Sequence, residues 1–189
     1  MLEETVIRSF IDIGRDIFLR GLISSHAGNM SVRADKHLYI TRRGSMMGRL
    51  HGADIIGIDL ERADDPNILS ASSELVVHRA IYLNTDALAV VHAHPPYGTL
   101  LSMAYGEIVP VDSEGSHLLK SIPVVTPERT IASDEAAQAV SGCLKNHGIV
   151  LVRGHGSFAR GDTLEEAYML TSSLESSAFY LYHLETLKP

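Results

Sequence analysis

Apolar residues recur along the chain with spacings that distinguish helices from strands. Near the N-terminus, Val6, Phe10, Ile13 and Ile17 lie three or four positions apart, with charged residues between them. This spacing places the apolar side chains on one face of a helix, and glycine is a residue at which helices commonly end. The pattern therefore predicts an amphipathic helix that ends near Gly21.

Shorter apolar runs predict strands, and longer periodic segments predict further helices. Strands are expected at 30–33, 38–41, 55–60, 87–91, 108–111, 123–125 and 149–152, and helices at 73–83, 97–104, 134–144 and 164–187. Ser72 and Ser133 are predicted N-caps, and Thr163 with Glu166 matches a capping box. Because the two kinds of element intermingle throughout, the sequence predicts one α/β domain over residues 1–189. Short connections between several strands predict antiparallel pairs in its sheet.

The composition is that of an ordinary globular protein, with 45% hydrophobic and 21% charged residues. A formal net charge of -7, with no basic run longer than Arg42-Arg43, argues against a nucleic-acid partner. Cys143 is the only cysteine, which excludes an internal disulfide. No apolar run approaches the roughly 20 residues that span a bilayer, and Glu3 and Glu4 stand where a signal peptide has basic residues. We therefore expect a cytoplasmic protein without a membrane partner.

The segment His92-Ala93-His94 carries the strongest chemical signal in the chain. It ends an apolar predicted strand, and Pro95 and Pro96 then stop that strand. Side chains at alternate strand positions point the same way, so both imidazoles are expected to face one spot at the end of the strand. Two converging neutral imidazoles are typical of a transition-metal site.

Two residues are natural partners for this pair of histidines. Glu74 lies in the first turn of the predicted helix 73–83, and His155 follows the predicted strand 149–152 between two glycines. Three histidines and a carboxylate suit Zn²⁺, and Mn²⁺, Co²⁺ and Fe²⁺ accept similar ligands. His78 shares a helical face with Glu74, so it is a rival ligand, a residue that supports the ligands, or a surface residue. The other six histidines are expected to be structural or exposed: His26, His37, His51, His117, His147 and His183.

A second group of residues is typical of an anion site. Main-chain amides at helix N-termini and glycine turns attract phosphate, and hydroxyl groups add hydrogen bonds. Arg42 or Arg43 would add positive charge. A phosphate bound directly before Glu74 would lie within the length of a small sugar from the metal. Three segments supply these features: Gly28-Asn29-Met30-Ser31, Gly44-Ser45 and Ser72-Ser73.

Four segments together resemble the class II aldolase/adducin family, and the resemblance covers nearly the whole chain. They occur in the family's order and at similar spacing: Gly28-Asn29-Met30-Ser31, Ser72-Ser73-Glu74 with His78, Val91-His92-Ala93-His94-Pro95, and Gly154-His155-Gly156. The resemblance implies a three-layer α/β/α sandwich with a mixed, largely antiparallel central sheet. It also implies a homotetramer with active sites between neighbouring subunits.

The resemblance further implies a zinc-dependent aldolase that cleaves a ketose 1-phosphate, of the L-fuculose 1-phosphate type, into dihydroxyacetone phosphate and a small aldehyde. Glu74 would bind the metal at rest and act as acid and base once substrate displaces it. By position, the zinc ligands would include His92, His94 and His155, and the phosphate-binding residues would be Gly28, Asn29, Gly44, Ser72 and Ser73.

Two positions depart from the family pattern. Arg43 stands where the sugar aldolases often carry a threonine, so it would add a phosphate contact or reshape the pocket. Near Asp112-Ser113 no tyrosine matches the one that, in a relative, helps protonate the aldehyde end from a neighbouring subunit. Two alternatives stay open. One is a dehydratase or epimerase that uses the same site, and the other is a non-catalytic module like the adducin head domain.

Overall fold

Eight strands form one sheet in the computed structural model, which describes residues 3–187. Across the sheet the strands follow the order β3-β2-β1-β4-β8-β7-β6-β5. Neighbouring strands are antiparallel except for β6 and β7, so the sheet is mixed and mostly antiparallel, as expected. Their bounds are β1 (Asn29–Ala34), β2 (His37–Thr41), β3 (Ile55–Asp59), β4 (Ala89–Ala93), β5 (Glu107–Ile108), β6 (Ile122–Val125), β7 (Ile149–Val152) and β8 (Gly156–Gly161).

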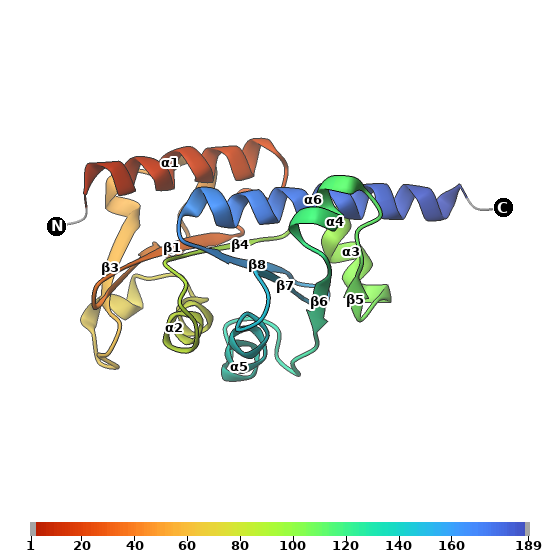
Figure 1. The fold of residues 1–189 in the computed structure, drawn as a ribbon. Coiled ribbons are helices and arrows are strands. Elements are labelled where there is room, and N and C mark those ends of the chain that lie inside the picture. The colour runs from red at the N-terminus through yellow and green to blue at the C-terminus, as the bar shows by residue number, and fades with distance from the viewer. Residues whose placement is uncertain (1–2, 188–189) are drawn as a thin grey trace.

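Helices cover both faces of this sheet, which gives the three layers seen in Figure 1. The face opposite α1 and α6 carries α2 (Leu75–Asn84) and α5 (Asp134–Cys143), which pack against each other. Three short 3-10 turns lie in the loops, at Met47–Arg49, Gly52–Asp54 and Pro66–Leu69. The other helices are α1 (Glu4–Leu19), α3 (Pro96–Ala104), α4 (Ser113–Leu118) and α6 (Leu164–Thr186).

Strand β4 lies in the middle of the sheet and divides its side chains between two hydrophobic cores. Ala89 and Val91 belong to the core beneath α1 and α6, whereas Val90 belongs to the core beneath α2 and α5. His92 lies two positions after Val90, so its side chain points to the same face of the sheet. Its ring stacks on Phe158 of the second core, with 4.1 Å between the ring centroids. The period of two along the strand therefore directs His92 toward the α2 and α5 side of the sheet.

The predicted helix starts are correct at two places and wrong at one. Ser133 accepts a hydrogen bond from the amide of Ala136 and caps α5 as predicted. Thr163 likewise accepts from the amide of Glu166 and caps α6. Helix α2, by contrast, begins at Leu75 rather than at residue 73, and Glu74 is its N-cap residue. The hydroxyl of Ser72 instead accepts from the amide of Glu74 before the helix has started.

Three elements of the sheet differ from the prediction. Strand β4, expected at 87–91, runs over Ala89–Ala93, so His92 lies within the strand. Strand β8 was not expected, because Phe158 is the only large apolar residue in Gly156–Gly161. Pairing with β4 on one side and β7 on the other stabilises it. The strand expected at 108–111 is reduced to Glu107–Ile108, because Pro110 has no amide hydrogen to donate to a neighbour.

Helix α6 is buried along its first half and more exposed along its second. Leu174 is fully buried, but Phe179 and Leu184 are exposed by 42% and 46%. The first half of the helix therefore contributes to the hydrophobic core, whereas the second half leaves large apolar side chains exposed. Among residues 3–187, none of the helices is both long enough and apolar enough to cross a membrane.

Candidate active site

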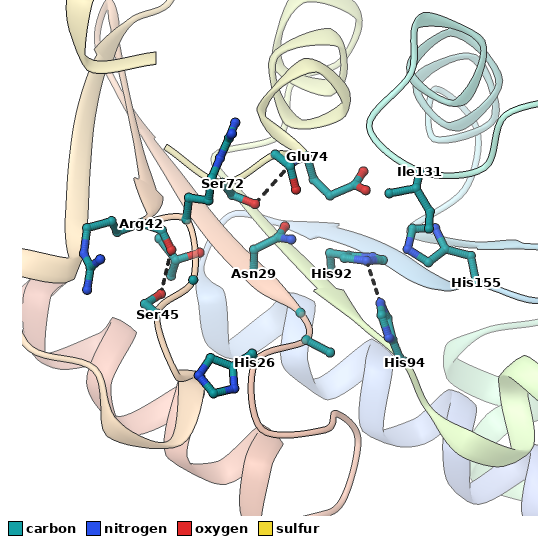
Figure 2. A pocket seen from close by; sticks show the side chains of 16 residues that line it. His26, Asn29, Arg42, Ser45, Ser72, Glu74, His92, His94, Ile131 and His155 are labelled. Carbon is teal, nitrogen blue, oxygen red and sulfur yellow. Dashed lines mark hydrogen bonds between the residues drawn. The ribbon is translucent and has the colours of Figure 1, made fainter. Parts of the chain in front are cut away.

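His92 and His94 project toward one point at the end of β4. Their Nε2 atoms lie 3.0 Å apart, and their ring centroids are separated by 4.8 Å. Figure 2 shows the two rings converging from the strand end, with His155 beside them. Two nitrogens bound to one tetrahedral ion at about 2.0–2.1 Å lie roughly 3.3 Å apart. The predicted convergence of this pair is therefore confirmed.

His155 reaches the same point from the turn between β7 and β8. Its ring centroid lies 4.8 Å from that of His92 and 5.0 Å from that of His94. The next residue, Gly156, packs against β4 so closely that a Cβ would overlap the carbonyl oxygen of Ala93. Glycine at this position brings the turn, and the His155 ring with it, against the strand that carries the other two histidines.

The three histidines fit a divalent metal ion. Each offers one ring nitrogen, and these nitrogens lie within 4.8 Å of one another. The Nδ1–H of His92 donates to the carbonyl of Ser157 at 2.9 Å, which leaves Nε2 as its free ligand atom. Burial lowers the pKa of all three rings, to about 4 for His94 and well below the usual value for His92. The rings are therefore neutral near pH 7, the form that binds metal.

Glu74 lies on the same cavity but outside this histidine cluster. Its Oε1 accepts a hydrogen bond from the backbone amide of Ala132 at 3.0 Å, and its Oε2 is buried without a partner among the described residues. Burial raises the pKa of this carboxyl to about 7, although the Ala132 amide opposes the rise. A carboxyl with this pKa is suited to both accepting and donating a proton near neutral pH.

One cavity of about 220 Å³ brings the histidines and the predicted anion-binding residues together. Gly28 has a φ of +76°, and a side chain there would meet both Ile23 and the carbonyl of His92. Glycine therefore allows the 28–31 segment to lie directly against the metal-site strand. All of the predicted site residues line this cavity: Gly28, Asn29, Arg43, Gly44, Ser72, Ser73, Glu74, His92, His94 and His155.

The two neighbouring arginines differ in their partners. Arg42 donates to Asp54 through Nε at 3.0 Å and through a terminal nitrogen at 2.6 Å. Burial would raise the pKa of Asp54, but these bonds hold it below its usual value, so the pair stays ionised. Among residues 3–187, the side chain of Arg43 makes one long hydrogen bond, from Nε to the carbonyl of Ala71 at 3.4 Å. Arg43 is therefore the arginine whose charge is available to the cavity.

His78 is not a member of the histidine cluster, so the rival-ligand interpretation is wrong. It is fully buried, and its Nε2 lies 2.6 Å from Oδ1 of Asn29 on β1. Burial lowers its pKa to about 3, so the ring is neutral. The contact of His78 is therefore with the predicted anion-binding wall rather than with the metal ligands.

The structure adds residues that the sequence did not single out. His26 was expected to be structural or exposed, and it is exposed, yet its ring also borders the cavity in Figure 2. Ile131 lines the opposite side from the loop before α5. No local sequence pattern predicts that either residue lines the cavity, because both lie in loops whose course depends on the tertiary fold. No tyrosine in the described part of the chain lines this cavity.

Comparisons with known proteins agree with this geometry. The family model described as Class II Aldolase and Adducin N-terminal domain matches residues 8–182. An L-fuculose phosphate aldolase from Methanococcus maripaludis is 32% identical over 183 residues, which cover 95% of this chain and 98% of the relative. A methylthioribulose-1-phosphate dehydratase from Methylococcus capsulatus is 30% identical, with 97% of this chain and 94% of the relative covered.

A solved structure gives the same picture. The crystal structure of an L-fuculose-1-phosphate aldolase from Thermus thermophilus superposes with a TM-score of 0.93 at 40% identity, and 99% of each chain is covered. The family match spans most of the chain, and the ring nitrogens of the histidine cluster are spaced to bind a divalent metal ion. The chain belongs to the class II aldolase and adducin family, and it is a metal-dependent lyase of the class II aldolase type.

Proposed function

We propose that this enzyme reversibly cleaves a ketose 1-phosphate of the L-fuculose 1-phosphate type into dihydroxyacetone phosphate and a small aldehyde. One observation carries the proposal: a single cavity is lined by the histidine cluster, by a buried carboxyl and by hydroxyl and amide groups suited to phosphate. The L-fuculose phosphate aldolases among its relatives support this substrate type.

The histidine cluster would hold the metal, and Zn²⁺ is the ion we propose. His92, His94 and His155 would be the ligands, with Glu74 as a fourth at rest. A bound divalent ion would supply positive charge that stabilises the negative charge developing on the ketone oxygen as the neighbouring carbon–carbon bond breaks. Because this charge takes the place of a Schiff base, the proposal requires no lysine in the cavity.

The polar wall would bind the phosphate and fix the position of the sugar. Gly28, Gly44 and Ser73 would offer backbone amides or a hydroxyl, and Asn29 and Ser72 side-chain donors. Arg43 would add a charge contact in place of the threonine that sugar aldolases often carry. Binding energy at this phosphate would hold the reacting carbons against the metal end of the cavity.

Glu74 would move the proton at the reacting carbon. Its carboxyl oxygen without a hydrogen-bond partner is buried at the cavity, and its pKa of about 7 matches the working range of an acid and base near neutral pH. A second proton donor is needed at the aldehyde end. We propose that a neighbouring subunit of a homotetramer supplies it, since no tyrosine of the described chain lines the cavity. The exposed apolar residues Phe179 and Leu184 on α6 support an interface between subunits.

The test is product analysis with zinc-loaded protein. L-fuculose 1-phosphate should yield dihydroxyacetone phosphate and an aldehyde in equal amounts, and the reverse condensation should regenerate the ketose phosphate. If no member of a ketose 1-phosphate panel yields dihydroxyacetone phosphate, the proposal is contradicted.

A dehydratase is the second candidate, because a methylthioribulose-1-phosphate dehydratase is 30% identical over nearly the whole chain. Both reactions need a polarised ketone and a carboxylate base, so the ligands do not separate them. Loss of water from the ketose phosphate, with the carbon chain intact, would favour the dehydratase.

A further inference from the structure

Four buried polar side chains form a continuous hydrogen-bonded row between α2 and β1. The hydroxyl oxygen of Tyr82 lies 2.8 Å from Oγ of Ser31, and Oγ of Ser31 lies 2.6 Å from Nδ1 of His78. Nε2 of His78 then lies 2.6 Å from Oδ1 of Asn29. Tyr82, Ser31 and His78 are at most 1% exposed, so bulk water does not take part in this row. The row starts in the core beneath α2 and ends at the wall of the cavity.

The protons in this row can be arranged in two directions. In one, the Tyr82 hydroxyl donates to Ser31, Ser31 donates to Nδ1 of His78, and Nε2–H of His78 donates to Oδ1 of Asn29. The hydrogens of the Tyr82 hydroxyl, the Ser31 hydroxyl and Nε2 of His78 then each have an acceptor within the row. In the other, the His78 proton lies on Nδ1, the amide of Asn29 is turned round, and Ser31 donates to Tyr82.

The second direction leaves a buried hydrogen without a partner. Within residues 3–187, Ser31 is the one hydrogen-bond partner of the Tyr82 hydroxyl, so this hydroxyl would lose its acceptor if Ser31 donated to it. An unpaired buried donor is costly, and the first direction avoids it. The deep burial of His78 also keeps the ring neutral, which leaves one proton to be placed.

The first direction determines what Asn29 presents to a ligand. Its carbonyl oxygen is taken by His78, and its NH₂ group has no acceptor within the described chain. Asn29 lines the cavity, so this NH₂ group is the part of the side chain left for a ligand. An amide held this way offers donors and no acceptor, which suits phosphate oxygens and disfavours ligand groups that can only donate.

We infer that His78 is a positioning residue: together with Ser31 and Tyr82 it locks the amide of Asn29 with its N–H donors toward the cavity, which makes this wall selective for oxyanions. The inference rests on the proposed phosphate-binding role of Asn29. It assigns His78 to the recognition of the phosphate rather than to the metal or to the chemical step.

The first test measures the tautomer of His78 in the wild-type protein. Long-range proton–nitrogen NMR should find the hydrogen of His78 on Nε2, with Nδ1 unprotonated. A hydrogen on Nδ1 would reverse the row and overturn the inference. This measurement needs neither a substitution nor a substrate, so it does not depend on the folding of a variant.

The second test compares two amide substitutions at the same site. In His78→Gln, the amide nitrogen of the new side chain reaches the position of Nε2 and can still donate to Asn29. In His78→Asn, the shorter side chain reaches only the position of Nδ1, so it keeps Ser31 and loses Asn29. Affinity for inorganic phosphate, measured on zinc-loaded protein, should fall about ten- to a hundredfold in His78→Asn and be largely retained in His78→Gln.

Zinc content and the cleavage of L-fuculose 1-phosphate separate this inference from the proposed function. Both variants should bind zinc as the wild type does, and the loss in His78→Asn should appear in KM rather than in kcat. Equal phosphate affinity in the two variants, or a parallel loss of zinc in both, would overturn the inference while leaving the aldolase proposal intact. If the wild type and the two variants bind phosphate in the predicted order of affinities but the wild type cleaves no ketose phosphate, the proposed function fails and the role of His78 stands.

Discussion

The carboxylate of Glu74 accepts a hydrogen bond from the backbone amide of Ala132, at 3.0 Å from its Oε1. This bond joins the start of α2 to the loop before α5, on the side of the sheet that carries the histidine cluster. It occupies one carboxylate oxygen and leaves the other without a partner among the described residues. The free oxygen is the one available to a metal or a substrate proton.

Replacing Glu74 with glutamine should remove proton transfer while preserving this bond, because the amide oxygen can still accept from Ala132. We expect kcat to fall about a hundred- to ten-thousandfold, the usual contribution of a positioned acid and base. Zinc content should change less, since the three histidines remain. Glu165→Gln, on the exposed start of α6, is the matched control. Steady-state kinetics that find wild-type kcat in Glu74→Gln would exclude this role.

The same carboxyl should make the stability of the metal-free protein depend on pH. Its pKa rises from 4.5 to about 7 on folding, so the folded state prefers the protonated acid. This contribution is fully present below about pH 4.5 and is lost as pH rises through 7, a difference of about 3 kcal/mol. Glutamine stays neutral, so metal-free Glu74→Gln should exceed the wild type by up to that amount at pH 8 and match it near pH 4. Denaturant unfolding at the two pH values measures this, and equal stabilities at pH 8 would contradict it.

Alanine at Gly156 should damage the metal site through the backbone. An added Cβ would overlap the carbonyl oxygen of Ala93 and approach the ring of His94 within 2.7 Å. We expect a loss of about 1–3 kcal/mol in the free energy of unfolding, as for other overpacked sites, together with weaker zinc binding. Gly142→Ala on α5 is the control, because a Cβ there meets nothing within 4 Å. That substitution should stabilise the protein by about 0.5–1 kcal/mol, and similar losses in both variants would refute the packing argument.

Threonine at Arg43 should test which residue supplies positive charge to the phosphate. We expect KM for the ketose phosphate to rise about tenfold, as for the loss of one charge-assisted hydrogen bond, with kcat little changed. Arg62→Thr, which removes an exposed partner of Asp64, is the control for the change in net charge. Unchanged KM in Arg43→Thr would mean that this arginine only shapes the cavity.

Local sequence patterns predicted the parts of the site that depend on one element. The direction of His92 and His94 follows from the period of two along β4, and the cap at Ser133 follows from its hydroxyl. Glu74 was expected near the histidines and lines the same cavity. Its bond to Ala132 was not predicted, because the two residues are 58 positions apart. No local rule relates a helix start to a distant loop.

The parts that were missed depend on tertiary packing. Strand β8 is held by its two neighbours rather than by its own composition. His78 shares a helical face with Glu74, and the sequence offered a ligand, a supporting residue or a surface residue as alternatives. The fold decides among them, because β1 places Asn29 and Ser31 opposite His78. The single domain over residues 1–189 stays a prediction.

The most direct test of the account is the dependence of ketose phosphate cleavage on metal bound to the histidine cluster. The release of dihydroxyacetone phosphate from L-fuculose 1-phosphate should be measured in chelator-treated protein as zinc is titrated back, with metal content determined at each point. We expect no activity without metal and a rise in proportion to bound zinc, up to one zinc per chain. Zinc should not restore activity in His94→Asn, whereas it should restore activity in the exposed-site control His37→Asn. Full turnover in the metal-free wild type, or restoration of His94→Asn to wild-type activity at the same zinc concentrations, would contradict it.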